Sequence, residues 1–422
     1  MEKKMCRAAL AVMVLFMLFG IGSCNRSGDG SGQIVLNALF MKQAGYSESD
    51  VGAITEQFQR DNPTIKINQT WVAYEELLPK ILASAKSGGY DIIVGDCIWT
   101  AQFVQAELVK DLTEKVGQLT LGDVWQGSLD AITYQGKYYG VPWLNDVKYL
   151  FYNKRMLAAA GFSSPPATWD EFQIQAQEIK RRGIVEYPAA WCWSQAEALI
   201  CDYTAVSGGF GGQFVDRNGA PTLNTPQNKA AIDFMYGTIR NGITNPMSLE
   251  MLEDDVLSTF CAGNAAFGLN WTYMFNSAQD PSVSSVVGDV GIAPIPGTQS
   301  VRSATVNGGM SLMMTSGSKY VDEGWKYMLY LSSPDVQARY SKDALPIWKS
   351  LFSNDTVIKT NPEIVPVAEV QYGYLVNRPM VPYYAQLSTV MQVEIQSVLL
   401  GTQSSDTALK NIQDTAERLR AQ

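Results

Sequence analysis

The feature of this sequence that most restricts its fold is a regular alternation of short apolar strands with amphipathic helices. Strands are predicted at residues 34–40, 65–71 and 90–94, with helices at 49–60 and 74–85 between them. Parallel strands need a long crossover connection, and a helix packed on the sheet supplies one. The alternation therefore predicts an α/β domain with a mostly parallel sheet, whose ligand-facing residues lie at the carboxyl ends of the strands.

A pattern of strand, break and strand follows at residues 135–153, QGKYYGVPWLNDVKYLFYN. Glycine and proline interrupt its first extended run, and an apolar run then resumes. Long segments of mixed strand and helix character flank this stretch, and 422 residues exceed what one core usually holds. We interpret it as the first crossing between two α/β lobes, with Trp143, Asn145 and Asp146 facing the cleft between them.

Alternating strand and helix signals continue to the C-terminus. Thr168 followed by Glu171 is a capping box, and Thr225-Pro226 places proline at the first position of a helix. Helices are predicted at 100–108, 154–160, 169–182, 196–206, 225–240, 256–261, 320–331, 335–342, 382–400 and 407–419. Strands are predicted at 188–193, 265–269, 290–295, 304–306 and 311–315.

The first 23 residues have the features of a processing segment. A basic head precedes an apolar run at 8–19, which is shorter than the roughly 20 residues needed to span a bilayer. The segment ends in Ile21-Gly22-Ser23-Cys24, which resembles a bacterial lipobox. We expect cleavage, lipidation of Cys24 and a flexible tether at 24–33, so that only the lipid touches the membrane at the periplasmic or cell-surface side. A plain secretory signal and an uncleaved anchor are the alternatives.

The composition excludes several classes of function. Histidine is absent, which rules out Ser-His-Asp and Cys-His catalysis and HExxH metal sites. No GxxxxGK[ST], GxGxxG or HExxH motif is present, so nucleotide and zinc chemistry have no support in the sequence, and we expect no cofactor or metal. The net charge of −9 becomes more negative once the basic head is removed, which disfavours binding to nucleic acid.

Four further cysteines follow Cys24, at positions 97, 192, 201 and 261, and their spacing matches no zinc or redox motif. A Cys192–Cys201 disulfide is possible outside the cytoplasm. Buried free thiols are the preferred interpretation.

The loops that follow the predicted strands are rich in Trp, Asp, Asn and Gly. Sugar recognition uses this mixture, because aromatic faces cover pyranose C–H surfaces while carboxylates and amides bond hydroxyl groups. Each candidate also has a structural alternative: helix capping, core packing, a tight turn or a surface cation. The candidate ligand-binding residues are Asp96, Trp99, Trp143, Asp146, Trp193, Asn270, Trp271, Gly308, Gly309 and Arg378.

A series of short motifs runs in order along the chain from about residue 34. They are Phe58 with Asn62-Pro63, Tyr90-Asp91-Ile92-Ile93, Leu108 with Asp111-Leu112-Thr113, Gly140-Val141-Pro142-Trp143, Phe151-Tyr152-Asn153-Lys154, Thr168-Trp169-Asp170-Glu171-Phe172, Gly263-Asn264-Ala265-Ala266-Phe267, Pro294-Ile295-Pro296-Gly297, Gly308-Gly309, Glu323-Gly324-Trp325-Lys326 and Leu331-Ser332-Ser333-Pro334. Together they resemble the extracellular solute-binding proteins of ABC importers, in the sugar-binding family that includes the maltose-, trehalose- and multiple-sugar-binding proteins.

The resemblance implies a type II periplasmic-binding-protein-like fold, in which two α/β lobes joined by several hinge crossings close over a sugar. The first lobe would comprise residues 34–142 and 307–345, and the second 143–306 and 346–422. Asp96, Asp146 and Arg378 would bind hydroxyl groups, and Trp271 would stack on the sugar. The protein would act as a monomer without catalysis, delivering its ligand to permease subunits whose ATPase is a separate chain.

The sequence is also compatible with two other functions. A surface glycoside hydrolase or lyase would use a pair of Asp or Glu residues. A binding protein for another solute would instead take glycerol phosphate, a polyamine or a peptide. A polyamine would require more carboxylates in the cleft, and a phosphate more basic groups than Arg378.

Overall fold

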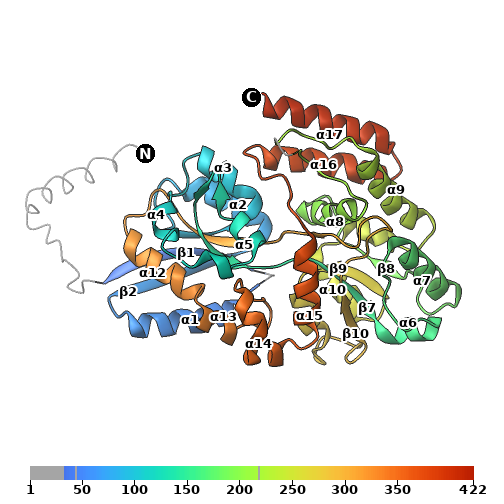
Figure 1. Ribbon diagram of the computed structural model, residues 1–422, viewed down its shortest axis with the longest axis horizontal. Coiled ribbons are helices and arrows are strands. Elements are labelled where there is room, and N and C mark those ends of the chain that lie inside the picture. The colour runs from blue at the N-terminus through green and yellow to red at the C-terminus, as the bar shows by residue number, and fades with distance from the viewer. Residues whose placement is uncertain (1–32, 43–44, 217–218) are drawn as a thin grey trace, which may run out of the picture.

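The computed structural model of the chain describes residues 33–42, 45–216 and 219–422. The predicted signal segment, the predicted lipidation site Cys24 and almost all of the predicted tether lie outside these ranges. Two α/β lobes lie side by side, with chain segments passing between them (Figure 1). The predicted class, a two-lobe α/β fold with several crossings, is confirmed. Within the described residues, no helix is long and apolar enough to cross a membrane.

The first lobe is built on a five-stranded sheet with the order β2-β1-β3-β12-β6. Its strands are β1 (Ile34–Met41), β2 (Ile65–Val72), β3 (Ile92–Asp96), β6 (Val141–Leu144) and β12 (Met310–Met314). Strand β1 pairs in parallel with β2 and β3, whereas β12 is antiparallel to both β3 and β6. The reversed strand β12 is the one that enters the sheet from the other lobe.

The second lobe repeats this arrangement on a smaller sheet with the order β10-β7-β9-β8. Its strands are β7 (Tyr149–Asn153), β8 (Ala189–Ala190), β9 (Phe267–Asn270) and β10 (Val290–Ala293). Here β7, which arrives from the first lobe, is antiparallel to β9 and β10, while β8 and β9 are parallel. Both sheets are therefore mixed, and in each the reversed strand is the one that follows a crossing.

Helices cover both sheets (Figure 1). Those of the N-terminal third are α1 (Glu48–Asp61), α2 (Tyr74–Ser84), α3 (Thr100–Gln105), α4 (Thr113–Val116) and α5 (Gln126–Asp130). Those between the first two crossings are α6 (Lys154–Ala160), α7 (Trp169–Arg181), α8 (Glu197–Gly209), α9 (Pro226–Arg240), α10 (Glu253–Cys261) and α11 (Tyr273–Ala278). The remainder are α12 (Val321–Leu331), α13 (Pro334–Arg339), α14 (Asp355–Thr360), α15 (Ile364–Gln371), α16 (Tyr384–Leu399) and α17 (Ser405–Arg420).

Side-chain caps fix the helix starts that the sequence indicated. The Thr168 hydroxyl accepts a hydrogen bond from Glu171 N, and Glu171 Oε2 accepts one from Ala167 N, one residue before the cap. Thr225 caps α9 in the same way. The strand predicted at 188–193 is shorter than expected, because the chain leaves the sheet after β8 and continues as a buried loop.

The first crossing joins β6 to β7, between Leu144 and Tyr149. The boundary predicted after residue 142 therefore falls inside β6, because Trp143 still belongs to the first sheet. Its indole packs against Phe40 and Tyr46 in the core of that lobe. The expectation that Trp143 faces the cleft is wrong, since the side chains of a strand alternate between the two faces of the sheet.

The crossings lie side by side and are hydrogen-bonded to one another. Val147 of the first crossing forms an isolated bridge with Asn307 of the second. Strand β11 (Thr305–Val306) of the second pairs in parallel with β13 (Leu375–Val376) of the third. A short hairpin, β4 (Thr133–Tyr134) with β5 (Lys137–Tyr138), precedes β6. The hinge is thus a small structure of its own rather than a set of separate linkers.

The four cysteines in the described part of the chain are buried free thiols. This confirms the preferred interpretation, and the alternative Cys192–Cys201 disulfide is not formed. Cys192 packs in a small apolar cluster, and Cys201 lies on α8.

Candidate functional site

A cleft of about 560 Å³ lies between the two lobes. First-lobe segments contribute Met41, Gly45, Tyr74, Glu75, Leu78, Pro79, Asp96, Ile98, Trp99, Leu144 and Met310. The crossings contribute Asp146, Gly308 and Arg378. The second lobe contributes residues 195–198, Cys201, residues 252–255, Trp271 and Tyr273. Helix α16 contributes Tyr384, Ala385, Ser388, Thr389 and Gln392.

Aromatic rings stand on both sides of the cleft. On the first lobe Tyr74 and Trp99 are stacked, with ring centroids 5.4 Å apart and planes 22° apart. On the second lobe Trp271 follows β9 and remains partly exposed, and Tyr273 begins α11 beside it. Flat apolar faces from two lobes can sandwich a ring-shaped ligand, and each contact is worth about 0.5–1.5 kcal/mol beyond the area buried.

Gly308 leaves the space that the indole of Trp271 occupies. A Cβ at position 308 would lie 2.3 Å from Cζ3 of the indole, closer than any non-bonded carbon contact allows. Only glycine therefore permits the ring to rest against the second crossing. The neighbouring Gly309 contributes backbone instead, donating to Asn307 Oδ1 and accepting from Cys97 N.

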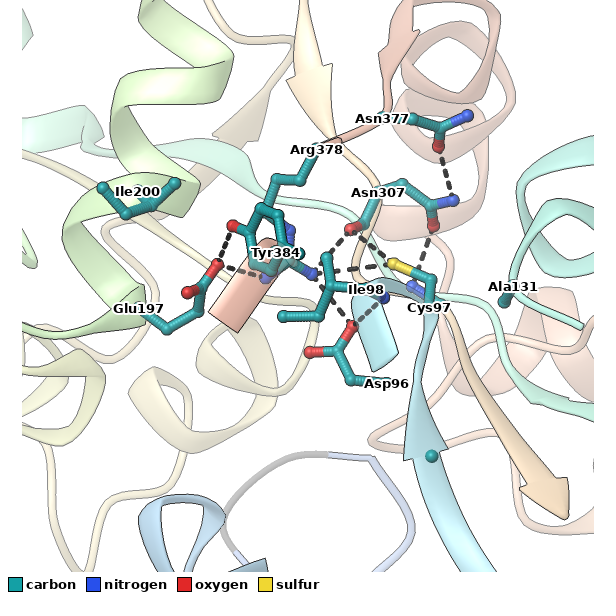
Figure 2. A network of polar contacts seen from close by, with 12 residues as sticks. Asp96, Cys97, Ile98, Ala131, Glu197, Ile200, Asn307, Asn377, Arg378 and Tyr384 are labelled. Carbon is teal, nitrogen blue, oxygen red and sulfur yellow. Dashed lines mark hydrogen bonds and ion pairs between the residues drawn. The ribbon is translucent and has the colours of Figure 1, made fainter. Parts of the chain in front are cut away.

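Arg378 joins the two lobes (Figure 2). Its Nη1 lies 2.8 Å from Glu197 Oε1 of the second lobe, and its Nη2 lies 3.1 Å from Asp96 Oδ1 of the first. Nη2 also donates to the carbonyl of Asn307. Arg378 is only 2% exposed, so one planar guanidinium bridges two carboxylates across the cleft floor.

Further hydroxyl groups complete the network around this bridge. Tyr74 donates to Asp96 Oδ2 at 2.8 Å, while Tyr384 and Ser388 of α16 donate to the two oxygens of Glu197. Burial alone would lower the pKa of Arg378, but the adjacent carboxylates, Asp96 above all, raise it well above its ordinary value. The bridge therefore stays charged, and its NH₂ groups are already bonded to protein.

Asp146 is a buried carboxyl at the edge of the cleft. Its Oδ1 accepts hydrogen bonds from Val147 N at 2.9 Å and from the Thr272 hydroxyl at 2.6 Å. Burial raises the pKa of Asp146 to about 7, although these hydrogen bonds oppose the rise. No hydrogen bond to protein is found at Oδ2 among the described residues, which leaves that oxygen free to bond a ligand.

The structure brings six of the predicted residues into the cleft, and they come from segments far apart in the chain. These are Asp96, Trp99, Asp146, Trp271, Gly308 and Arg378. The other four line no part of it. Trp143 and Trp193 are core residues, and Asn270 and Gly309 lie behind the wall.

The correction for Trp193 has a clear cause. Its ring stacks on Trp191, with centroids 5.8 Å apart and planes 19° apart, in the core of the second lobe. Asn270 holds the wall in place, since its Oδ1 accepts from Trp271 N and its Nδ2 donates to the carbonyl of Glu253. A residue at the end of a strand can thus serve the site without touching a ligand.

Sequence reasoning missed several cleft residues, chiefly acids and hydroxyls at helix starts. Among them are Tyr74, Glu197, Glu253, Tyr273, Tyr384 and Ser388. One signal was available for Glu197 and Glu253, because each opens a helix that follows an apolar segment, and helix starts cluster at the same edge as strand ends. Tyr384 and Ser388 come from the C-terminal helices and carry no local signal.

The charge of the cleft is strongly one-sided. Among the described residues that line it are seven acidic side chains, of which Asp146 has a raised pKa, and one guanidinium. Within the same described ranges, no group of three or more His, Cys, Asp or Glu is arranged to hold a metal ion. The arrangement suits hydrogen bonding to hydroxyl or amine groups together with stacking on apolar rings.

Comparison with known proteins gives the same fold at modest identity. The family profile described as "Bacterial extracellular solute-binding protein" matches residues 44–338. A "Probable ABC transporter-binding protein" of Deinococcus radiodurans is 26% identical over 347 residues, covering 80% of this chain and 81% of the relative. A "Maltotriose-binding protein" of Pyrococcus abyssi is 23% identical over 327 residues, covering 75% and 67%.

Solved structures superpose over almost all of the described chain. A maltose-bound binding protein of T. maritima has a TM-score of 0.84 at 25% identity and covers 92% of this chain and 100% of its own. An ABC transporter solute-binding protein of Agrobacterium radiobacter K84, in complex with ribitol, has a TM-score of 0.81 at 23% identity, covering 92% and 98%.

Proposed function

This chain belongs to the bacterial extracellular solute-binding protein family, and from that premise we propose that it captures a carbohydrate between its lobes for an ABC importer. The family consists of binding proteins rather than enzymes, and its members work outside the cytoplasm. The captured sugar would pass to permease subunits in the membrane, with the ATPase on a separate chain. The protein would do this as a monomer.

The observation that carries the proposal is a cleft with aromatic faces on both lobes and hydrogen-bonding groups between them. Tyr74 on one side and Trp271 on the other, both partly exposed, provide surfaces for pyranose rings, with the buried rings of Trp99 and Tyr273 beside them. Micromolar affinity requires about 8 kcal/mol. Two stacked rings, the apolar area they cover and several hydrogen bonds to carboxylates supply that amount.

A ligand panel tests the proposal. At 100 times its dissociation constant a ligand adds about 2.7 kcal/mol to stability, so a matching sugar raises the melting temperature measurably. The panel should contain mono-, di- and oligosaccharides and sugar alcohols. Failure of every carbohydrate to shift the melting temperature would overturn the assignment.

Replacing the proposed stacking residue should weaken the same ligand. We expect Trp271→Ala to lower affinity at least about tenfold, since it removes both stacking and buried area. Trp325→Ala is a matched control, because Trp325 is a partly buried indole on α12 that does not line the cleft and is also placed beside a lysine, Lys115. Isothermal titration gives both affinities, and equal effects of the two substitutions would contradict a binding role for Trp271.

A second candidate is a solute that carries amino groups, such as a polyamine. The presence of seven acidic side chains against one guanidinium along the cleft favours it. Polyamines therefore belong in the same melting panel, and a stronger shift with a polyamine than with any sugar would replace the carbohydrate assignment. Shortened oligosaccharides after incubation would instead reveal a glycoside hydrolase.

The anchoring of the protein is part of the proposal. We propose that Cys24 is lipidated after removal of residues 1–23 and that the segment 24–33 tethers the lobes to the membrane. Metabolic labelling with a fatty-acid analogue should mark the wild-type protein and not Cys24→Ser. Equal labelling of both would exclude lipidation at this residue.

A further inference from the structure

Lys148 is a cation buried completely within the first crossing, next to the cleft wall. Its side chain is 0% exposed. Its Nζ lies 2.7 Å from Asp202 Oδ1 of α8 and 3.4 Å from Glu253 Oε1 at the start of α10. Burial alone would lower the pKa of Lys148, but the two carboxylates, Asp202 first, raise it well above its ordinary value, so the ammonium remains charged.

A buried ion pair of this kind does little for stability by itself. The cost of removing both charges from water cancels much of their attraction, and apolar residues of similar size are often as stable. Stabilisation of the lobe therefore does not explain why the pair Lys148–Asp202 is buried there. The position of the pair next to a wall of the proposed binding cleft suggests that it acts on a residue of that wall.

Lys148 and Glu253 both contact the indole of Trp271. The ammonium lies 5.2 Å from the centroid of the ring, within the range of a cation–π interaction. Glu253 Oε1, the same oxygen that faces Lys148, accepts a hydrogen bond from Trp271 Nε1 at 3.2 Å. One carboxylate oxygen thus links the cation to the polar edge of the ring while the cation attracts the ring itself.

The backbone on either side of the indole restricts it further. Gly308 lies against its six-membered ring, and Asn270 bonds both Trp271 N and the carbonyl of Glu253. Neither of these contacts is a hydrogen bond to the ring itself. The hydrogen bond at Nε1 is the directional contact that selects one orientation.

We propose that Lys148 and Glu253 are positioning residues that fix the indole of Trp271 as a rigid wall of the cleft, so that a ligand ring meets a surface already set in place. The benefit of this arrangement to ligand binding rests on the proposed function. A preset wall spares the ligand the cost of immobilising a side chain, about 0.5–1.5 kcal/mol. The orientation of the ring itself can be measured without any ligand.

The test is ¹⁹F NMR of the protein labelled with 5-fluorotryptophan. The chain has 10 tryptophans, and the resonance that disappears in Trp271→Phe identifies position 271. We expect Glu253→Ala to shift that resonance and at least double its line width. Glu253→Gln retains an acceptor for Nε1 and should restore a line close to the wild-type width.

The role of the cation is tested separately, because Lys148→Met alone leaves Asp202 buried without its partner. The double variant Lys148→Met/Asp202→Asn removes both charges together and keeps the volume similar. It should also broaden the position-271 line, while the resonances of the remote tryptophans stay unchanged and report an intact fold. Arg339→Met with Asp335→Asn, an exposed ion pair on α13, is the matched control and should alter nothing at position 271.

The outcomes separate this inference from the proposed function. An unchanged position-271 resonance in both Glu253→Ala and Lys148→Met/Asp202→Asn would overturn the positioning role, leaving packing against Gly308 as the whole cause. Failure of carbohydrates to bind the wild-type protein would overturn the proposed function and leave the NMR result standing. With a bound sugar, affinity should fall about tenfold in Glu253→Ala and less than threefold in Glu253→Gln.

Discussion

At the scale of single residues, the cleft depends on what surrounds particular side chains. Gly308 leaves room for an indole, and Asp146 places a carboxyl where burial opposes its ionisation. Neither property follows from residue type alone. Both come from neighbours that other segments of the chain bring to the hinge.

The contact between Gly308 and Trp271 leads to a prediction about stability. Gly308→Ala should destabilise the protein by about 1–3 kcal/mol, since the added Cβ forces the indole or the second crossing to move. Urea unfolding measures this cost. In a Trp271→Ala background the same change should cost much less, because the clash is gone.

A second glycine provides the comparison for this effect. A Cβ added to Gly237 in α9 would meet no atom within 4 Å, so Gly237→Ala should be neutral or stabilise the helix by up to about 1 kcal/mol. If Gly308→Ala is as mild as Gly237→Ala, the indole has another position available.

Asp146 should make stability depend on pH. Its pKa is about 7 in the folded protein and near 3.8 in the unfolded chain, so between these values the folded state holds a proton that the unfolded state has lost. Stability from this group is therefore full below pH 4 and declines as pH rises toward 7, by at most about 1.4 kcal/mol per pH unit.

Comparison with Asp146→Asn isolates this contribution. The charges nearest to Asp146, including Lys148, remain in both proteins. Chemical unfolding at several pH values should show the wild-type protein losing stability relative to Asp146→Asn between pH 4 and pH 7. Parallel curves for the two proteins would mean that Asp146 ionises in the folded state as readily as in water.

At the scale of elements, local signals fixed helix starts better than strand lengths. Helix α7 begins at the predicted cap because the bonds among Thr168, Glu171 and Ala167 involve residues only a few positions apart. Strand β8 is reduced to two residues because its length depends on pairing with β9, a segment far along the chain.

The cap of α7 gives a prediction at this scale. Thr168→Ala should cost about 1 kcal/mol of unfolding free energy, because it removes the acceptor for Glu171 N at the first turn. Thr168→Ser keeps the hydroxyl and should stay within about 0.5 kcal/mol of the wild-type protein. Equal losses in the two variants would assign the effect to the threonine methyl group instead.

At the scale of the whole molecule, the hinge and the bridge through Arg378 decide how the lobes meet. Asp96 lies at the end of β3 and Glu197 at the start of α8, and a single guanidinium from the third crossing bonds both (Figure 2). Separating the lobes by more than a hydrogen-bond length at this point must break one of these two bonds. The bridge therefore ties opening of the cleft to the loss of a buried ion pair.

Arg378→Lys tests this coupling. Lysine keeps the charge but lacks the planar fork that reaches both carboxylates at once, so we expect lower stability by about 1–3 kcal/mol and a more open average shape. Small-angle X-ray scattering without ligand should report a larger radius of gyration. Arg339→Lys, at an exposed ion pair, should change neither quantity measurably.

Unchanged scattering and stability in Arg378→Lys would show that the lobes are held by the crossings themselves. The paired strands β11 and β13 and the bridge between Val147 and Asn307 would then set the angle between the lobes.

The sequence by itself determined the alternation of strands and helices, the first crossing and the chemistry to expect at strand ends. These features depend on period, caps and turns, which are local, and Asp96, Trp99 and Trp271 were found in this way. Tertiary structure alone decided which aromatic residues face the cleft, so that Trp143 and Trp193 are core residues while Tyr384, at the start of α16, belongs to the site. Pairing register and the meeting of distant segments decide that question, and neither is encoded within a few residues of the position concerned.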